Sequence, residues 1–141
     1  MANASARTRV PLVAPRVPIH DGDVARLVHT FYARIRDDAE LGPIFEARLA
    51  GRWDAHLAKM VDFWSAIAGE TGRYSGRPQR AHGGMGLDEA AFARWLALFE
   101  ATARDVCPPD AAAFLVDRAH RIADSLMIGL GIGPQALDLP A

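Results

Sequence analysis

The residues with the clearest capacity for metal chemistry in this 141-residue chain are five histidines: His20, His29, His56, His82 and His120. A neutral imidazole binds transition metals, including iron, through one ring nitrogen while a second group holds the other N–H. His20 lies in a proline-containing leader, His29 on the polar side of a helix and His120 between arginines, where solvent exposure is usual. His56 and His82 are therefore the two candidate ligands, and the residues alone do not choose between them.

Two polar aromatic side chains, Tyr32 and Trp95, lie at the edges of apolar stripes on separate predicted helices. His56 lies on the inner face of a third helix, so three rings with polar atoms can converge on one interior site. Buried Tyr and Trp normally find hydrogen-bond partners, and periodicity alone favours the ordinary interpretation that each ring bonds a nearby carbonyl group.

The elements that position these residues are predicted to be helices, because apolar side chains recur three and four residues apart and no strand-like alternation occurs. We expect four substantial helices and an all-α protein. The predicted helices are about 22–37, about 54–68, one that starts after Asp88 and ends at Pro108, and one that ends at the glycines from Gly129 onward.

Glycine and proline mark the connections between these helices. Gly42 and Pro43 predict a tight turn that carries the apolar residues Ile44 and Phe45. Repeated glycines between the second and third helices predict a long loop, which contains His82; loops of this length in compact domains are usually functional or disordered. The expected organisation is an extended leader over 1–19, one domain over 20–131 and a tail over 132–141.

The composition limits the functional class. Half of the residues are hydrophobic and 23% are charged, which is typical of a globular protein, and the net charge of −1 gives no basic face for nucleic acid. The single Cys107 cannot form an internal disulfide, and no stretch is long and apolar enough to span a membrane. We expect a cytoplasmic protein that is a monomer or weak dimer.

Several short motifs, taken in order, resemble those of the group III truncated haemoglobins. Any one of them is weak, but their order and spacing over about residues 20–130 are similar to the family pattern. The motifs are residues 31–36 (FYARIR), 41–45 (LGPIF), His56 followed by Phe63 and Trp64, 72–78 (GRYSGRP) with Ala81 and His82, and 92–99 (FARWLALF).

The resemblance implies a shortened globin fold, two helices packed over two, with haem b between them. It implies that His82 is the proximal iron ligand and that Tyr32, His56 and Trp95 lie on the distal side, where small diatomic ligands such as dioxygen, nitric oxide or carbon monoxide bind. The remaining residues of the expected haem pocket are Phe31, Phe45, Lys59, Met60, Phe63, Tyr74 and Arg80.

Charge and packing refine this implied site. Lys59 and Arg80 are candidates to pair with the haem propionates, whereas for Arg77 solvated surface charge is favoured. For Trp64 and Tyr74, packing is favoured over chemistry. Gly83-Gly84-Met85-Gly86 departs from the Leu-containing segment that follows the proximal histidine in the family, and its backbone freedom should loosen this loop.

Three hypotheses about function remain open. Donation from Tyr32 and Trp95 would hold dioxygen tightly, which suits a store or sensor rather than bulk transport, with His56 as a gate or third polar contact. The same donors would serve an enzyme that uses nitric oxide or peroxide, with a reductase as partner. The third hypothesis is a helical domain without haem.

Overall fold

The structure, a computed structural model, describes residues 19–69 and 87–131, and these residues form helices joined by short turns. The five helices are α1 (Asp21–Asp37), α2 (Leu41–Leu49), α3 (Trp53–Gly69), α5 (Glu89–Val106) and α6 (Pro109–Leu130). No strand occurs within these two ranges. The predicted leader, the glycine-rich loop and the tail lie outside the described residues.

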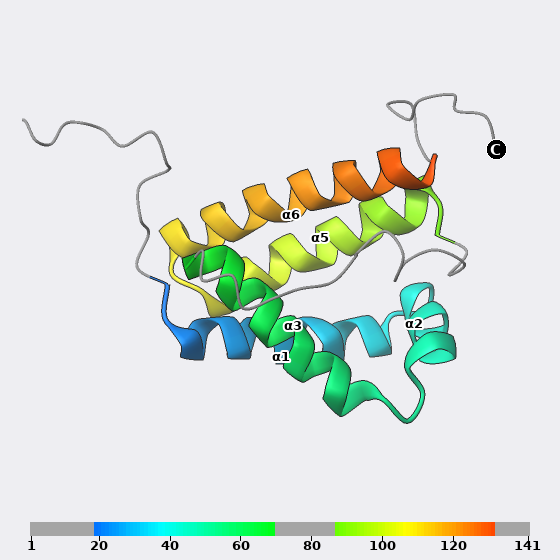
Figure 1. Ribbon diagram of the computed structural model, residues 1–141, viewed down its shortest axis with the longest axis horizontal. Coiled ribbons are helices and arrows are strands. Elements are labelled where there is room, and N and C mark those ends of the chain that lie inside the picture. The colour runs from blue at the N-terminus through cyan, green and yellow to red at the C-terminus, as the bar shows by residue number, and fades with distance from the viewer. Residues whose placement is uncertain (1–18, 70–86, 132–141) are drawn as a thin grey trace, which may run out of the picture.

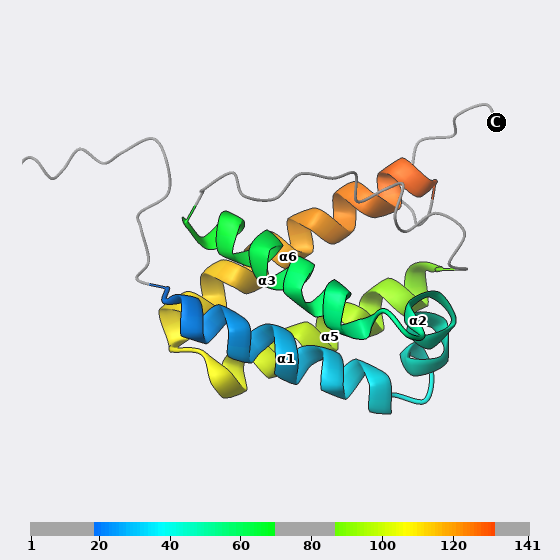
Figure 2. The same ribbon diagram turned by 60° about the horizontal axis from the view of Figure 1, so that its bottom comes forward.

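The helices form two packed pairs. α5 and α6 lie side by side, α1 packs against α3, and the contact of α1 along α5 joins the two pairs (Figures 1 and 2). Leu27, Phe31 and Ile35 of α1 and Phe99 of α5 are almost completely buried where the pairs meet. The predicted all-α, two-over-two architecture is confirmed.

Most helix boundaries follow from local signals in the sequence. The Asp88 carboxylate caps α5, because its Oδ1 accepts a hydrogen bond from the backbone N–H of Ala91 at 2.8 Å. α6 starts with Pro109 in its first turn and is capped by Gly131, whose φ of 73° suits a residue without a Cβ atom. Gly129, expected among the residues that end this helix, lies inside it.

The prediction of a tight connection at Gly42 and Pro43 is wrong, because these residues belong to the first helical turn of α2. Proline is tolerated there, since the first N–H groups of a helix have no partner within the helix. Glycine is required by the close approach of the preceding chain: a Cβ atom on Gly42 would lie 2.8 Å from the carbonyl oxygen of Arg36. The two residues that indicated a break therefore start a helix.

Asp38 anchors this corner to the rest of the molecule. Its Oδ2 accepts hydrogen bonds from the backbone N–H groups of Glu40 and Leu41, at 3.0 and 2.8 Å, and so caps α2. The same carboxylate accepts hydrogen bonds from the guanidinium of Arg94 on α5, at N–O distances of 2.7 to 2.8 Å. The hydrogen bond from Arg94 lowers the pKa of Asp38 to about 2, so one carboxylate holds the α1–α2 corner against α5.

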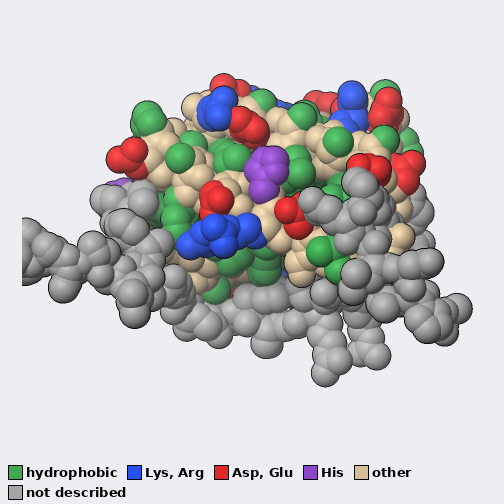
Figure 3. All heavy atoms as spheres, turned by 90° about the horizontal axis from the view of Figure 1, so that it is seen from above, with side chains coloured by type: hydrophobic (Ala, Val, Ile, Leu, Met, Phe, Trp, Pro, Cys, Tyr) green, Lys and Arg blue, Asp and Glu red, His purple; other side chains and the backbone are tan. Residues whose placement is uncertain are grey.

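The surface seen from the α6 side mixes charge types. Figure 3 shows cationic, anionic and hydrophobic side chains interspersed on this face, without a large patch of one sign. None of the helices in the described ranges is both long and apolar enough to cross a membrane.

Candidate functional site

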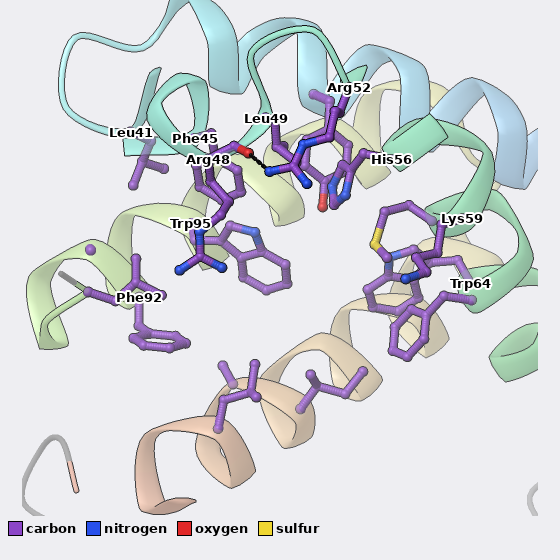
Figure 4. Close-up of a pocket in the computed structure, with 18 of the residues that line it drawn as sticks. Leu41, Phe45, Arg48, Leu49, Arg52, His56, Lys59, Trp64, Phe92 and Trp95 are labelled. Atoms are coloured by element: carbon purple, nitrogen blue, oxygen red, sulfur yellow. Dashed lines mark hydrogen bonds between the residues drawn. The ribbon is translucent and has the colours of Figure 1, made fainter. Parts of the chain in front are cut away.

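A cavity of about 410 Å³ lies between the two helix pairs, and all five described helices contribute to its walls (Figure 4). Apolar side chains make most of the lining, which includes Phe45 and Leu49 from α2, Met60 from α3, Phe92 from α5 and Leu126 from α6. A mostly apolar hollow with a few polar groups is the usual form of a cofactor or small-molecule site.

The structure brings Tyr32, His56 and Trp95 together at this cavity, as the helix faces predict. The rings of Tyr32 and His56 meet edge to face, with centroids 4.9 Å apart. Trp95 stacks on Phe99 at 5.5 Å and meets Phe31 edge to face at 5.5 Å, which fixes the indole plane. Three polar-tipped rings from α1, α3 and α5 therefore border one space.

The hydroxyl of Tyr32 and the indole N–H of Trp95 differ from most buried donors. Among the described residues neither group donates a hydrogen bond to the protein, although both side chains line the cavity. Trp53, by contrast, donates its Nε1–H to Oε1 of Glu46 at 2.9 Å. Burial raises the pKa of the Tyr32 hydroxyl, which therefore keeps its proton. The interpretation that Tyr32 and Trp95 bond nearby carbonyl groups does not hold within the described part of the chain.

Aromatic packing behind the cavity holds these rings in place. Phe31, which was expected in the pocket, lies one layer deeper: it contacts Tyr32, Trp95 and Phe99 and is not among the side chains that line the cavity. Trp64 is buried and packs on Phe99 at 4.8 Å, in agreement with the expected packing role, and it also forms part of the wall.

Three cationic side chains lie at the cavity, and of these only Lys59 was expected. Lys59 lines it, and so do Arg48 at the end of α2 and Arg52 in the turn that follows (Figure 4). The guanidinium of Arg52 donates to the carbonyl oxygen of Arg48 at 2.7 Å, which draws the two residues together. Sequence reasoning missed Arg48 and Arg52 because α2 was expected to be a turn; their four-residue spacing was the available signal.

The other predicted residues divide into three sets. Phe45, Met60 and Phe63 line the cavity with the residues above. His82, Tyr74 and Arg80, together with Arg77 and the glycines after His82, lie outside the described residues. His20, His29 and His120 are exposed, as expected. In the described ranges no three His, Cys, Asp or Glu side chains gather in a way that could hold a metal ion.

Comparison with known proteins gives consistent similarities. A family model described as bacterial-like globin matches residues 20–126. The group 3 truncated hemoglobin ctb of Campylobacter jejuni is 31% identical over 109 residues, which cover 74% of this chain and 86% of that protein. The crystal structure of a group III truncated hemoglobin from Campylobacter jejuni superposes with a TM-score of 0.75 at 30% identity, covering 80% of this chain and 92% of the other.

Proposed function

Because this chain belongs to the bacterial-like globins, as a member of their group III truncated haemoglobins, we propose that its cavity holds haem b and binds dioxygen tightly. When bound, haem would supply an iron atom at which a diatomic ligand binds. We propose His82 as the residue that holds the iron from the opposite side, with the iron five-coordinate at rest.

The residues present fit this group. The cavity of about 410 Å³ is within the range of cofactor sites, about 300–1,000 Å³, and its apolar walls suit a flat macrocycle. Two carboxylates at one edge of the group would meet the cations of Arg48, Arg52 and Lys59, which line the same cavity. We propose that these three side chains receive the propionates.

The observation that carries the proposal is the pair of donors at Tyr32 and Trp95, which face the cavity without an acceptor in the described part of the protein. Dioxygen held between them would accept a hydrogen bond from each. At about 1–2 kcal/mol for each bond, the two together would slow its release by roughly 10- to 1,000-fold. Tight retention suits a store or a sensor better than a carrier.

His56 adds a third polar group to the same wall, in edge-to-face contact with Tyr32. We propose that its imidazole contacts the ligand or gates its entry. Enzymatic use of nitric oxide or peroxide is the second candidate function. The contact of Tyr32 with Trp53, which leads out of the cavity, favours peroxide chemistry in particular.

Spectroscopy of the purified protein tests the proposal. We expect a Soret band that is lost in His82→Ala, kept in His56→Ala and unchanged in the surface control His29→Ala. Absence of the band in the native chain would support a helical domain without haem. A band lost in His56→Ala and kept in His82→Ala would reverse the ligand assignment.

Turnover separates the two candidate functions. Dioxygen release and nitric oxide consumption by the reduced, dioxygen-loaded protein are measured side by side with a reductant present. Slow release without nitric oxide or peroxide turnover supports binding alone, whereas sustained turnover supports the enzyme.

A further inference from the structure

A second hollow lies on the outer side of Tyr32. It is an open groove of about 700 Å³ between α1, α2 and α3, lined by His29, Arg36, Glu46 and Trp53 among others. Within the described residues, Tyr32 alone lines both this groove and the cavity. A single aromatic ring therefore separates the proposed haem site from an outer surface that small molecules can reach.

Trp53 continues the aromatic contact from Tyr32 into the groove. Its ring centroid lies 6.4 Å from that of Tyr32 and 6.4 Å from that of His56, while Tyr32 and His56 are 4.9 Å apart. Trp53 is 7% exposed, lines the groove and is not part of the cavity wall. Rings in direct contact provide a short path for an electron between groove and cavity.

The indole of Trp53 has a proton acceptor in place. Its Nε1–H donates to Oε1 of Glu46 at 2.9 Å, within reach for proton transfer. The guanidinium of Arg36 lies 4.4 Å from the centre of the indole ring and 4.0 Å from the same carboxylate oxygen. A positive charge over the ring disfavours an indole radical cation, so oxidation of Trp53 is tied to loss of its Nε1 proton.

The cavity aromatics are less suited to hold an oxidised state. Oxidised Tyr32 must lose a proton, yet its hydroxyl has no acceptor among the described residues, and burial raises its pKa. Trp64 and Trp95 likewise donate to no carboxylate within the described ranges. Trp53 is thus the aromatic residue near the cavity at which electron loss and proton loss are coupled.

We propose that Trp53 and Glu46 form a one-electron oxidation site for small phenolic or hydroquinone reductants that enter the groove, connected to the cavity through Tyr32. The inference rests on the proposed haem in that cavity. The groove suits such donors because it is open, lies against a planar indole and offers a carboxylate for the donor hydroxyl.

The chemistry balances with hydrogen peroxide as the oxidant. Peroxide takes up two electrons and two protons and leaves as two waters. For each electron that peroxide takes up, Trp53 loses one electron to the cavity through Tyr32 and transfers its Nε1 proton to Glu46. Trp53 is then a neutral radical. A donor hydroxyl then returns one electron to the indole and releases its proton to water, while Glu46 gives its proton back to Nε1, and the donor leaves as a radical. The two protons that two donors release balance the two that peroxide takes up. Two donor molecules are consumed for each peroxide.

Freeze-quench EPR on the haem-loaded protein mixed with hydrogen peroxide tests the proposal. We expect a tryptophanyl radical whose lines narrow when the protein carries indole-ring-deuterated tryptophan. Trp53→Phe keeps an aromatic ring at this position and should abolish the signal. Glu46→Gln keeps an acceptor oxygen for Nε1–H but cannot take the proton. It should slow hydroquinone oxidation by about 100-fold.

Glu40→Gln is the matched control, because it makes the same change at an exposed carboxylate outside the groove. This variant should leave the tryptophanyl EPR signal and the rate of hydroquinone oxidation unchanged. The Soret band of each variant reports whether haem is still held and the chain folded. A native protein without that band overturns the proposed function and this inference with it. A normal band with a radical on Tyr32 or another tryptophan, or with no radical, overturns the inference alone.

Discussion

The polar aromatic side chains near the cavity differ in whether their hydrogen-bond donors have an acceptor in the protein. The ring of Trp53 contacts Tyr32, and the ring of Trp95 contacts Phe31. Of these two indoles, only Trp53 donates its N–H to a carboxylate. Tyr32 is buried and Trp95 is half-buried, and neither donor has an acceptor among the described residues although both side chains line the cavity. Donors in this state are consistent with groups reserved for a ligand.

Removing these donors one at a time should accelerate dioxygen release. Tyr32→Phe and Trp95→Phe each keep an aromatic ring in place, and each should raise the dissociation rate constant about 5- to 30-fold, equivalent to about 1–2 kcal/mol. Stopped-flow displacement of dioxygen by carbon monoxide measures the rate. His29→Gln, on the exposed side of α1, serves as the control. Unchanged release in both variants would show that neither donor reaches the ligand.

The sequence predicted these residues because helical spacing fixes which side chains face inward. Tyr32, His56, Met60 and Trp95 all reach the cavity from the stripes that predicted them. Phe31 is a different case, because spacing places a residue on the buried face of a helix but does not separate a pocket wall from the layer behind it. Arg48 and Arg52 were missed because α2 was expected to be a turn, and because long cationic side chains reach a cavity from positions where exposed residues are expected.

At the scale of elements, α2 depends on a glycine rather than on helix propensity. Gly42→Ala would place a Cβ atom 2.8 Å from the Arg36 carbonyl oxygen and 3.3 Å from that of Ile35, and these backbone atoms cannot move away without shifting the corner. We expect a loss of about 1–3 kcal/mol in the free energy of unfolding, measured by urea denaturation.

Gly22→Ala provides the matched control for this change. Gly22 also lies in the first turn of a helix, but a Cβ atom there meets nothing within 4 Å. It should be neutral or stabilise the protein by up to about 1 kcal/mol, since alanine has the higher helix propensity. Equal effects of the two substitutions would contradict the close approach at Gly42.

The Asp38–Arg94 link makes the corner sensitive to acid. The hydrogen bond from Arg94, aided by the backbone N–H groups of Leu41 and Glu40, lowers the pKa of Asp38 to about 2, against about 3.9 in an unfolded chain. Because the folded pKa is the lower one, the stabilisation is complete above about pH 4 and is lost as the pH falls towards about 2.

Asp38→Asn should remove this dependence. The variant should be less stable than the native chain at pH 7, and the difference between the two should shrink between about pH 4 and pH 2. Urea denaturation across this range measures it, with the exposed neighbour Asp37→Asn as control. A difference that stays constant over the range would show that the carboxylate is not selectively stabilised in the folded state.

The elements were predictable wherever one local signal dominated. Apolar spacing located α1, α3, α5 and α6 to within a residue or two, and the Asp88 cap fixed the start of α5. α2 was not predictable, because its cap comes from Asp38 and its tolerance of Gly42 and Pro43 from the path of the preceding chain. Both depend on contacts that single-sequence patterns do not contain.

At the scale of the whole molecule, the cavity is the meeting point of all five described helices, so its contents and the fold are coupled. Apolar side chains enclose a space of about 410 Å³, with α2 and α3 on one side and α5 and α6 on the other. An apolar group that fills this space removes surface from water on both pairs at once. The haem should therefore act as part of the core.

Haem loading should accordingly raise the thermal midpoint of unfolding. At a free haem concentration of about 1,000 times the dissociation constant, the gain is about 4 kcal/mol, or about 10–20 °C for a chain of this size. Differential scanning calorimetry measures the shift. Metal-free protoporphyrin fills the apolar space but forms no bond to His82, so it should give a smaller rise. His82→Ala should abolish the shift with haem, because this variant is expected to lose the group together with its Soret band. Equal midpoints with and without haem, in a protein that shows a Soret band, would mean that the group lies on the surface rather than among the five helices.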